Sequence, residues 1–231
     1  MNKTSRLLAF LALALAFALP SVGYAQTAVS VETVNICAMM RAKDGKADEL
    51  RNALLALATP TRSDDGYIAY DAYEEKSGAL FLHEVWRSQE DLDRHLQKPD
   101  VQDFVKKSPA RLDGKNDAHF GKAISISEKP QASRSAESIS ICSIKHPKAG
   151  KADELRRALL SLSSPTSKEP GNLAYNIYEE KDGSLFLFET WRSMADLERH
   201  FGTPYVKDFR SKVDGLADVN EVHIGKPISN Q

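Results

Sequence analysis

Two histidines occupy equivalent positions in this sequence, each nine residues after a tryptophan: His95 follows Trp86, and His200 follows Trp191. An imidazole titrates near neutral pH, so a histidine in a partly apolar setting can accept a proton from a bound molecule. The spacing therefore makes both histidines candidate general bases. The alternative is a core histidine whose ring is satisfied by a backbone carbonyl.

Two carboxylates lie just before the tryptophans, where alternation places them on a covered face of a strand. Glu84 stands between Leu82 and Trp86, and Glu189 is its counterpart. A buried carboxylate needs a partner. The expected partner of Glu84 is Arg87, Arg94 or the Tyr70 hydroxyl, which would make a structural pair, and the functional alternative is a group that orients the histidine.

Aromatic side chains complete the candidate sites. Trp86 and Trp191 are expected to line a pocket and to stack on an aromatic ligand. The alternative is that both are ordinary core residues. Tyr70 and Tyr175, on the neighbouring strand, line the pocket or fill the core. In either case their hydroxyls require a hydrogen-bond partner.

The sequence gives less reason to assign a functional role to the remaining histidines. His119 and His223 fall in the last strand of each unit, where they face the same cavity or solvent. His83 has Phe188 as its counterpart, which indicates packing. His146 stands next to a proline in a predicted loop and suggests no role.

The stretch from Leu80 to Leu96 must position these groups. Residues Leu80–Trp86 alternate with large apolar groups on both faces, which predicts a strand covered on both sides. Ser88 and Asp91 can cap a helix that begins at Gln89. His95 then shares one helix face with Leu92 and Leu96.

The same stretch recurs, because residues 36–104 superpose on residues 141–209 at an offset of 105. Each unit is expected to hold a strand at about 31–41, a helix ended by a loop at 59–66, strands at 67–75 and 80–86, a helix that breaks near Pro99, and a strand at 117–127. This order predicts a ferredoxin-like α+β unit. The fold class is therefore two tandem ferredoxin-like domains whose sheets pair into an intramolecular dimeric α+β barrel.

The N-terminal residues have the composition of a signal peptide. Lys3 and Arg6 precede an apolar run that Pro20 ends, and Ala25 supplies a small residue for cleavage. We expect residues 1–25 to be a signal peptide and the protein to be periplasmic or secreted. Domains are predicted at 26–126 and 139–231, joined by a polar linker at 127–138. No later stretch is apolar enough to cross a membrane.

The net charge and the cysteine content limit which binding partners and metal sites the sequence predicts. The formal net charge of −1 offers no basic surface for nucleic acid. Cys37 and Cys142 fall at equivalent repeat positions, and export would permit a disulfide. The alternative is that each is a free, buried, small apolar residue. Two isolated cysteines do not predict a zinc site.

The repeated motifs resemble those of the antibiotic biosynthesis monooxygenase domain family, over roughly residues 33–126 and 138–228. They are Gly-Lys-x-Asp-Glu-Leu-Arg opening a helix, Pro-Thr near its end, Gly-x-x-x-Tyr in the next strand, and Glu-x-Trp-Arg-Ser-x-x-x-Leu-x-x-His. The resemblance implies a pocket between sheet and helices in each unit. It also implies oxygenation without metal or flavin in several members, where a deprotonated phenol or quinol reacts with dioxygen itself. The heme-degrading branch is not indicated, because no histidine ligand follows Phe104 or Phe209.

The sequence thus predicts an exported monooxygenase-like enzyme that oxidises a quinol or related small aromatic with dioxygen and no cofactor. His95 and His200 are the expected proton acceptors. The alternative is a non-catalytic periplasmic protein that binds a small hydrophobic ligand. The substrate, the number of active units and any further homo-oligomer stay open.

Overall fold

Two halves with the same order of elements make up the protein. The computed structural model describes residues 33–127 and 135–228. The first half contains β1 (Val34–Met40), α2 (Ala47–Arg62), β2 (Tyr67–Glu75), β3 (Leu80–Trp86), α3 (Gln89–Leu96), α4 (Pro99–Arg111) and β4 (Asp117–Ser125). The second contains β5 (Ile139–Pro147), α5 (Ala152–Ser167), β6 (Asn172–Glu179), β7 (Leu185–Trp191), α6 (Met194–Phe201), α7 (Pro204–Leu216) and β8 (Ala217–Pro227). The predicted ferredoxin-like repeat is confirmed.

Some predicted segments differ from the structure or lie outside it. The loop expected from Thr59 begins later, because α2 continues through Pro60 to Arg62. The predicted signal peptide and residues 128–134 of the predicted linker lie outside the described residues. Within the described ranges, no helix combines the length and apolar character needed to cross a membrane.

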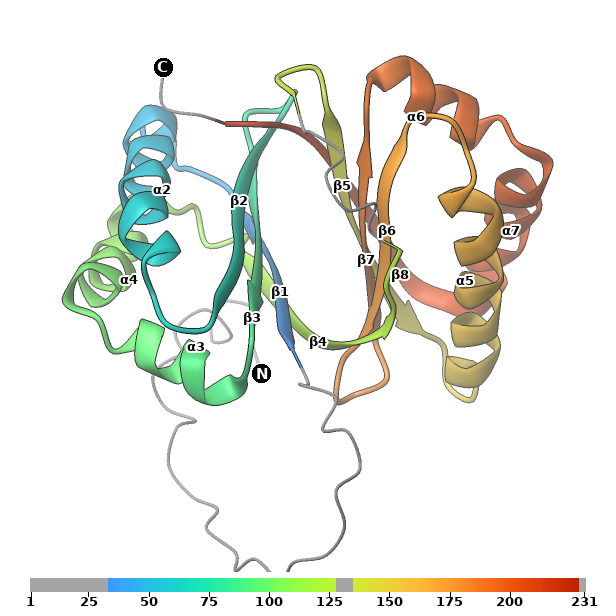
Figure 1. The fold of residues 1–231 in the computed structure, drawn as a ribbon, viewed down its shortest axis with the longest axis horizontal. Coiled ribbons are helices and arrows are strands. Elements are labelled where there is room, and N and C mark those ends of the chain that lie inside the picture. The colour runs from blue at the N-terminus through green and yellow to red at the C-terminus, as the bar shows by residue number, and fades with distance from the viewer. Residues whose placement is uncertain (1–32, 128–134, 229–231) are drawn as a thin grey trace, which may run out of the picture.

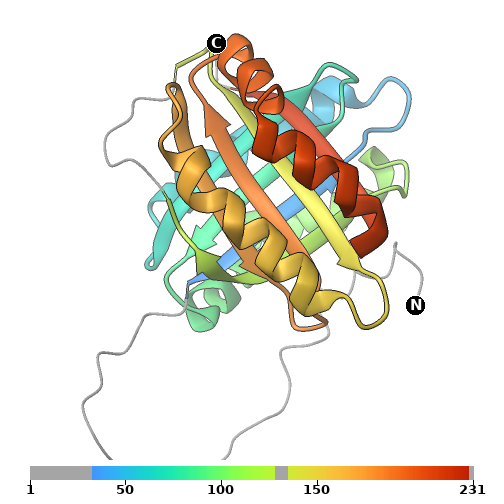
Figure 2. The same ribbon diagram turned by 90° about the vertical axis from the view of Figure 1, so that its right-hand side faces the viewer.

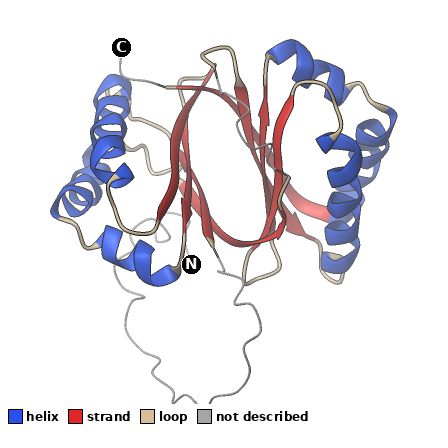
Figure 3. Cartoon of the chain, in the orientation of Figure 1, coloured by secondary structure: helices blue, strands red, loops and turns tan. Residues whose placement is uncertain are grey.

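The strands form one closed barrel, in the order β1-β3-β2-β8-β5-β7-β6-β4. The two halves join where β2 pairs with β8 and where β4 pairs with β6, both antiparallel. The last strand of each half therefore extends the sheet of the other. Figure 1 and Figure 3 show the strands at the centre and the helices on two outer sides, and Figure 2 shows α5 and α7 lying across the sheet of the second half. The predicted intramolecular barrel is confirmed.

The inside of the barrel is an apolar core built by both halves. Tyr73 stacks on Phe81 with ring centroids 4.8 Å apart, and their counterparts Tyr178 and Phe186 stack at 4.7 Å. His83 stacks on Phe188 at 3.7 Å with the rings nearly parallel. Burial of these rings from both halves helps to hold the halves together.

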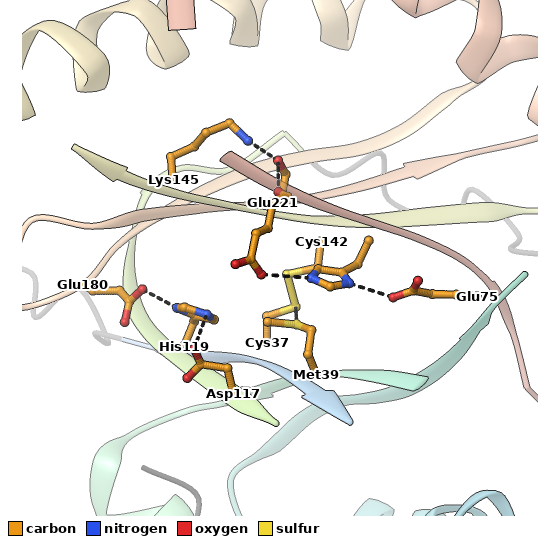
Figure 4. Close-up of a disulfide and its surroundings, with 11 residues drawn as sticks. Cys37, Met39, Glu75, Asp117, His119, Cys142, Lys145, Glu180 and Glu221 are labelled. Carbon is orange, nitrogen blue, oxygen red and sulfur yellow. Dashed lines mark hydrogen bonds and ion pairs between the residues drawn. A yellow bond between two sulfur atoms is a disulfide. The ribbon is translucent and has the colours of Figure 1, made fainter. Parts of the chain in front are cut away.

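A disulfide crosses this core. Cys37 of β1 and Cys142 of β5 are bonded with an S–S distance of 2.06 Å and a Cα–Cα distance of 6.7 Å, as Figure 4 shows. Both residues are fully buried. The interpretation of two free cysteines is wrong, because barrel closure brings the equivalent positions of the two first strands face to face.

Two histidine–carboxylate pairs also join the halves. His119 Nδ1 lies 2.7 Å from Glu180 Oε1, and His223 Nδ1 lies 2.7 Å from Glu75 Oε1. Each pair links one half to the other, and Figure 4 shows His119 and Glu180 near the disulfide. Neither histidine lines a cavity beneath the helices, because alternation on β4 and β8 turns both toward the barrel side of the sheet.

The start of α3 is fixed by a tight local arrangement. Ser88 Oγ accepts a hydrogen bond from the Asp91 backbone N–H at 3.2 Å, and Arg87 donates to the buried Asp91 carboxylate. Gly66 has a φ of +84°, and a Cβ there would lie 2.1 Å from Asp91 Cγ. Only glycine fits this position. The corresponding residues in the second half are Ser193, Asp196 and Gly171.

Candidate functional site

Each half encloses a cavity between its sheet and its helices. The first has a volume of about 250 Å³ and the second about 280 Å³. The predicted site residues that line the first cavity are Tyr70, Glu84 and His95. Those that line the second are their counterparts Tyr175, Glu189 and His200. Each half therefore brings three of its four predicted site residues to one hollow.

His95 is held by a carboxylate from the loop after α2. Its Nδ1 lies 2.7 Å from Asp64 Oδ2, and both side chains are about 95% buried, with exposures of 4% and 5%. The Lys98 ammonium donates to the other oxygen of Asp64. A carboxylate accepts only, so the neutral ring carries its proton on Nδ1 and keeps Nε2 as an acceptor.

His200 repeats this arrangement with a longer carboxylate. Its Nδ1 lies 2.6 Å from Glu169 Oε1, which also accepts a hydrogen bond from the Tyr205 hydroxyl. The other ring nitrogen, Nε2, lies 3.8 Å from Glu189 Oε2. Burial, together with the Glu169 bond, raises the pKa of Tyr205 to about 12, so the phenol remains a hydrogen-bond donor.

Sequence reasoning missed Asp64 and Glu169. Both belong to the predicted loop that ends the first helix of each unit, and each stands 31 residues before its histidine. A usable signal exists, because the two positions are equivalent in the repeat and both are acidic. This signal is easy to overlook, because one residue is Asp and the other is the longer Glu.

The buried glutamates bind the tryptophans. Trp86 Nε1 donates to Glu84 Oε2 at 2.8 Å, and Trp191 Nε1 donates to Glu189 Oε2 at 3.0 Å. Burial raises the pKa of both carboxyl groups, although the indole N–H and the nearby histidine oppose the shift.

The partners expected for Glu84 from the sequence were wrong. Arg87 and Arg94 instead bind Asp91. Residues two apart on a strand share a face, so the Trp86 indole reaches the Glu84 carboxylate directly.

The tryptophans do not line the cavities, contrary to the expectation that they wall them. Both are fully buried. The Trp86 ring lies 4.5 Å from the His95 ring, centroid to centroid, and the Trp191 ring lies 4.6 Å from the His200 ring. Each strand ends beneath its short helix, so the indole packs behind the histidine and positions the glutamate.

The tyrosine hydroxyls differ between the halves. Tyr70 Oη donates to the Leu54 carbonyl oxygen at 3.2 Å. Tyr175 Oη, by contrast, is buried and has no hydrogen-bond partner in the part of the chain that the structure describes. Burial raises the pKa of both phenols well above the usual value, so both are neutral donors.

Polar residues distinguish the second cavity from the first. Ser143, Lys145 and Arg210 line the second cavity, at the repeat positions that Ala38, Met40 and Val105 occupy in the first. Burial lowers the pKa of Lys145 to about 8, opposed by the Glu189 carboxylate. Sequence reasoning did not single out Lys145, although a charge in place of Met40 in an otherwise apolar strand is a visible signal.

Comparison with known proteins identifies the family of this chain. The sequence profile of the family described as Antibiotic biosynthesis monooxygenase matches residues 33–107 and 140–212. This chain belongs to that family. The two matched regions fall in the two halves of the barrel, so the predicted resemblance to this family is confirmed.

Two relatives match part of this chain. Putative monooxygenase Rv0793 of Mycobacterium tuberculosis is 37% identical over 71 residues, which are 30% of this chain and 70% of that protein. Uncharacterized protein sll1783 of a Synechocystis strain is 37% identical over 87 residues. That match spans 36% of this chain and 59% of that protein.

Two solved structures share the fold over most of this chain. A putative monooxygenase from Fusobacterium nucleatum superposes with a TM-score of 0.76 at 13% identity, covering 87% of this chain and 94% of that one. An anthrone oxidase-like protein superposes with a TM-score of 0.70 at 11% identity, covering 88% and 94%. At such identities the likeness concerns the fold alone.

Across the described ranges, no group of three or more histidine, cysteine or acidic side chains could hold a metal ion. What each half does offer is a buried imidazole, oriented by one carboxylate and close to a second, beside a largely apolar cavity. This set of groups can remove a proton from a ligand and hold it.

Proposed function

We propose that this family member is an exported monooxygenase that oxidises a quinol or related small aromatic with dioxygen, without a metal or flavin. His95 and His200 act as the proton acceptors. The observation that carries this proposal is the pairing of each imidazole Nδ1 with a buried carboxylate, at 2.7 and 2.6 Å. This pairing leaves Nε2 of each ring as the acceptor in a cavity-lining residue.

The first step of the proposed reaction is proton transfer from an aromatic hydroxyl to Nε2. The imidazolium that forms is stabilised by Asp64 in the first half and by Glu169 in the second. Apolar walls exclude water and keep the aromatic anion from being reprotonated. Dioxygen then adds at a ring carbon that carries two hydrogens in the keto form. One oxygen remains there as a carbonyl, and the other leaves as water with the remaining hydrogen of that carbon and the proton that the imidazolium returns.

Export rests on two supports. Residues 1–25 have the composition of a signal peptide. The Cys37–Cys142 disulfide fits an oxidising compartment such as the periplasm, where such bonds persist. A fusion of residues 1–30 to a reporter enzyme that is active only outside the cytoplasm tests this part of the proposal.

Oxygen uptake by the protein from Gln26 onward, measured with a panel of quinols, tests the catalytic part. We expect the His95→Gln, His200→Gln double variant to lose about 10²–10⁴-fold in turnover. His83→Phe is the matched control, since the second half carries phenylalanine at that position and His83 lies in the barrel core. This control should keep the activity of the wild type.

Three outcomes decide between the candidate functions. Equal turnover by the wild type and the double variant would overturn the role of the histidines. Tight binding of quinols with no oxygen uptake would favour the alternative, a non-catalytic protein that binds a small hydrophobic ligand. A shift in the heme absorption band on titration would contradict the exclusion of the heme-degrading branch.

A further inference from the structure

Lys145 presents an unusual buried cation to the second cavity. The residue lies on β5, is 3% exposed and lines the cavity. Its ammonium donates to Ser143 Oγ, and that hydroxyl in turn donates to the Glu221 carbonyl oxygen at 3.1 Å. The ammonium forms no further hydrogen bond with residues 33–127 or 135–228. An ammonium has three N–H donors, so two remain for a ligand.

A second cation lines the same cavity. Arg210 comes from α7, and its guanidinium carbon lies 5.1 Å from the centroid of the Phe201 ring. It is close enough to disfavour the charged form of Lys145. Two like charges brought together in a partly apolar hollow repel each other, and a bound anion relieves that repulsion.

The carboxylate within the cavity does not neutralise both cations. Glu189 lines the cavity, but burial raises its pKa and its oxygen already accepts from the Trp191 indole. Among the residues that line the cavity, Lys145 and Arg210 therefore stand as two cations against the single carboxyl group of Glu189.

Other groups in the second cavity favour an organic anion with an aromatic body. Tyr175 Oη is a buried donor without a described partner. Much of the remaining wall is apolar, formed by Leu159, Leu162, Leu187 and Val206. A cationic group, a free hydroxyl donor and an apolar wall together match a ring that bears a carboxylate.

We propose that the second cavity binds a small aromatic carboxylate through Lys145 and Arg210, whereas the first cavity binds a neutral aromatic. This inference rests on the proposed function for the idea that both cavities are substrate sites, and it names the substrate class of one of them. The first cavity has Met40, Ala38 and Val105 in place of the polar residues, and Glu84 is its buried carboxyl group. A carboxylate gains no cationic partner there.

Calorimetric titration with 2-naphthoate and with the neutral 2-naphthalenemethanol tests the inference. Lys145→Met installs the residue of the first cavity, so it is compatible with this fold. We expect it to weaken 2-naphthoate binding at least about tenfold, the loss typical of one charge-assisted bond, and to leave the alcohol unchanged. Met40→Lys is the reciprocal variant and should add naphthoate binding to the first cavity.

The pH dependence gives a second readout. A lysine that titrates near pH 8 is charged below that value, so naphthoate affinity should fall as the pH rises from 7 to 9.5. The titratable and charged groups that surround the ammonium are Glu189 of β7, His200 of α6, Arg210 of α7 and Tyr175 of β6. The Lys145→Met variant should lack this pH dependence.

Two results would overturn the proposal. These are equal naphthoate affinity in the wild type and Lys145→Met, with both folded by circular dichroism, or naphthoate bound in the first cavity in a crystal of the complex. Failure of the proposed function is distinguishable, because binding is measured without turnover. A protein that binds naphthoate but consumes no oxygen loses only the enzymatic assignment.

Discussion

The two cavities share the groups that hold the histidine and differ in the groups that meet a ligand. Both have a carboxylate on Nδ1 and an indole-bound glutamate near the ring. The walls differ, with Lys145 in one cavity and Met40 in the other. Duplication has thus kept the geometry of proton transfer and changed the chemistry of recognition.

The partners of the histidines show how one role is filled by different residues. Asp64 is held by the Lys98 ammonium, whereas the longer Glu169 is held by the Tyr205 hydroxyl. In the repeat, Thr203 corresponds to Lys98. The orienting carboxylate is kept in both halves, while the second residue that binds this carboxylate changes.

Replacing one histidine at a time should have the largest effect. His95→Gln should reduce turnover of a neutral quinol by about 10²–10⁴-fold, because the base of the first cavity is gone. Turnover of an acidic aromatic should persist in this variant, and His200→Gln should give the reverse pattern. Oxygen uptake with the two substrate types measures this. Loss of both activities in either single variant would mean that the cavities do not work separately.

Removal of the disulfide should affect both cavities alike. The Cys37→Ala, Cys142→Ala double variant should lose about 2–5 kcal/mol of the free energy of unfolding, because the bond closes a long loop in the unfolded chain. Urea denaturation under non-reducing conditions measures the change. A loss of ligand binding confined to one cavity would contradict the view that the bond belongs equally to both halves.

Lys145→Met should stabilise the protein by about 1–3 kcal/mol at pH 7, because a buried ammonium is unfavourable. The folded-state pKa of about 8 lies below that of an unfolded lysine. The buried ammonium therefore destabilises the folded wild type fully below pH 8, and this destabilisation decreases as the pH rises toward about 10.4. Denaturant titrations at pH 7 and pH 10 should show that the difference in the free energy of unfolding between the two proteins is smaller at pH 10. A larger difference at pH 10 would contradict the prediction.

Tyr205→Phe should have the smallest effect, about 1 kcal/mol in the free energy of unfolding, since it removes one hydrogen bond to Glu169. Activity in the second cavity should fall by a few-fold, and activity in the first should not change. Measurement with the two substrate types again separates the halves. An equal fall with both would indicate a general loss of structure.

Much of the fold follows from local pattern. Alternation at Leu80–Trp86 and the Ser88 cap give a strand and a helix at the positions found. The internal repeat then gives two sheets, each with one bare face, and barrel closure covers both. The disulfide could not be deduced, because the contact between β1 and β5 exists only across the closed barrel.

The candidate site was predictable only where residues lie on one element. His95 and Glu84 follow from their own helix and strand. Asp64 does not, since a chain reversal brings it from a loop to the helix face. Arg210 reaches the cavity of Lys145 from a helix that begins 59 residues later, at Pro204. The pairing of Trp86 with Glu84 was accessible, because the two share a strand face.

The pairing of each last strand with the other half, inside a single chain, fixes the ratio of the two cavities. A barrel assembled from separate, identical chains would carry two copies of the same pocket and would come apart on dilution. Here β8 completes the sheet of the first half and β4 that of the second within one polypeptide. Every molecule therefore carries one hollow of each kind, at any concentration.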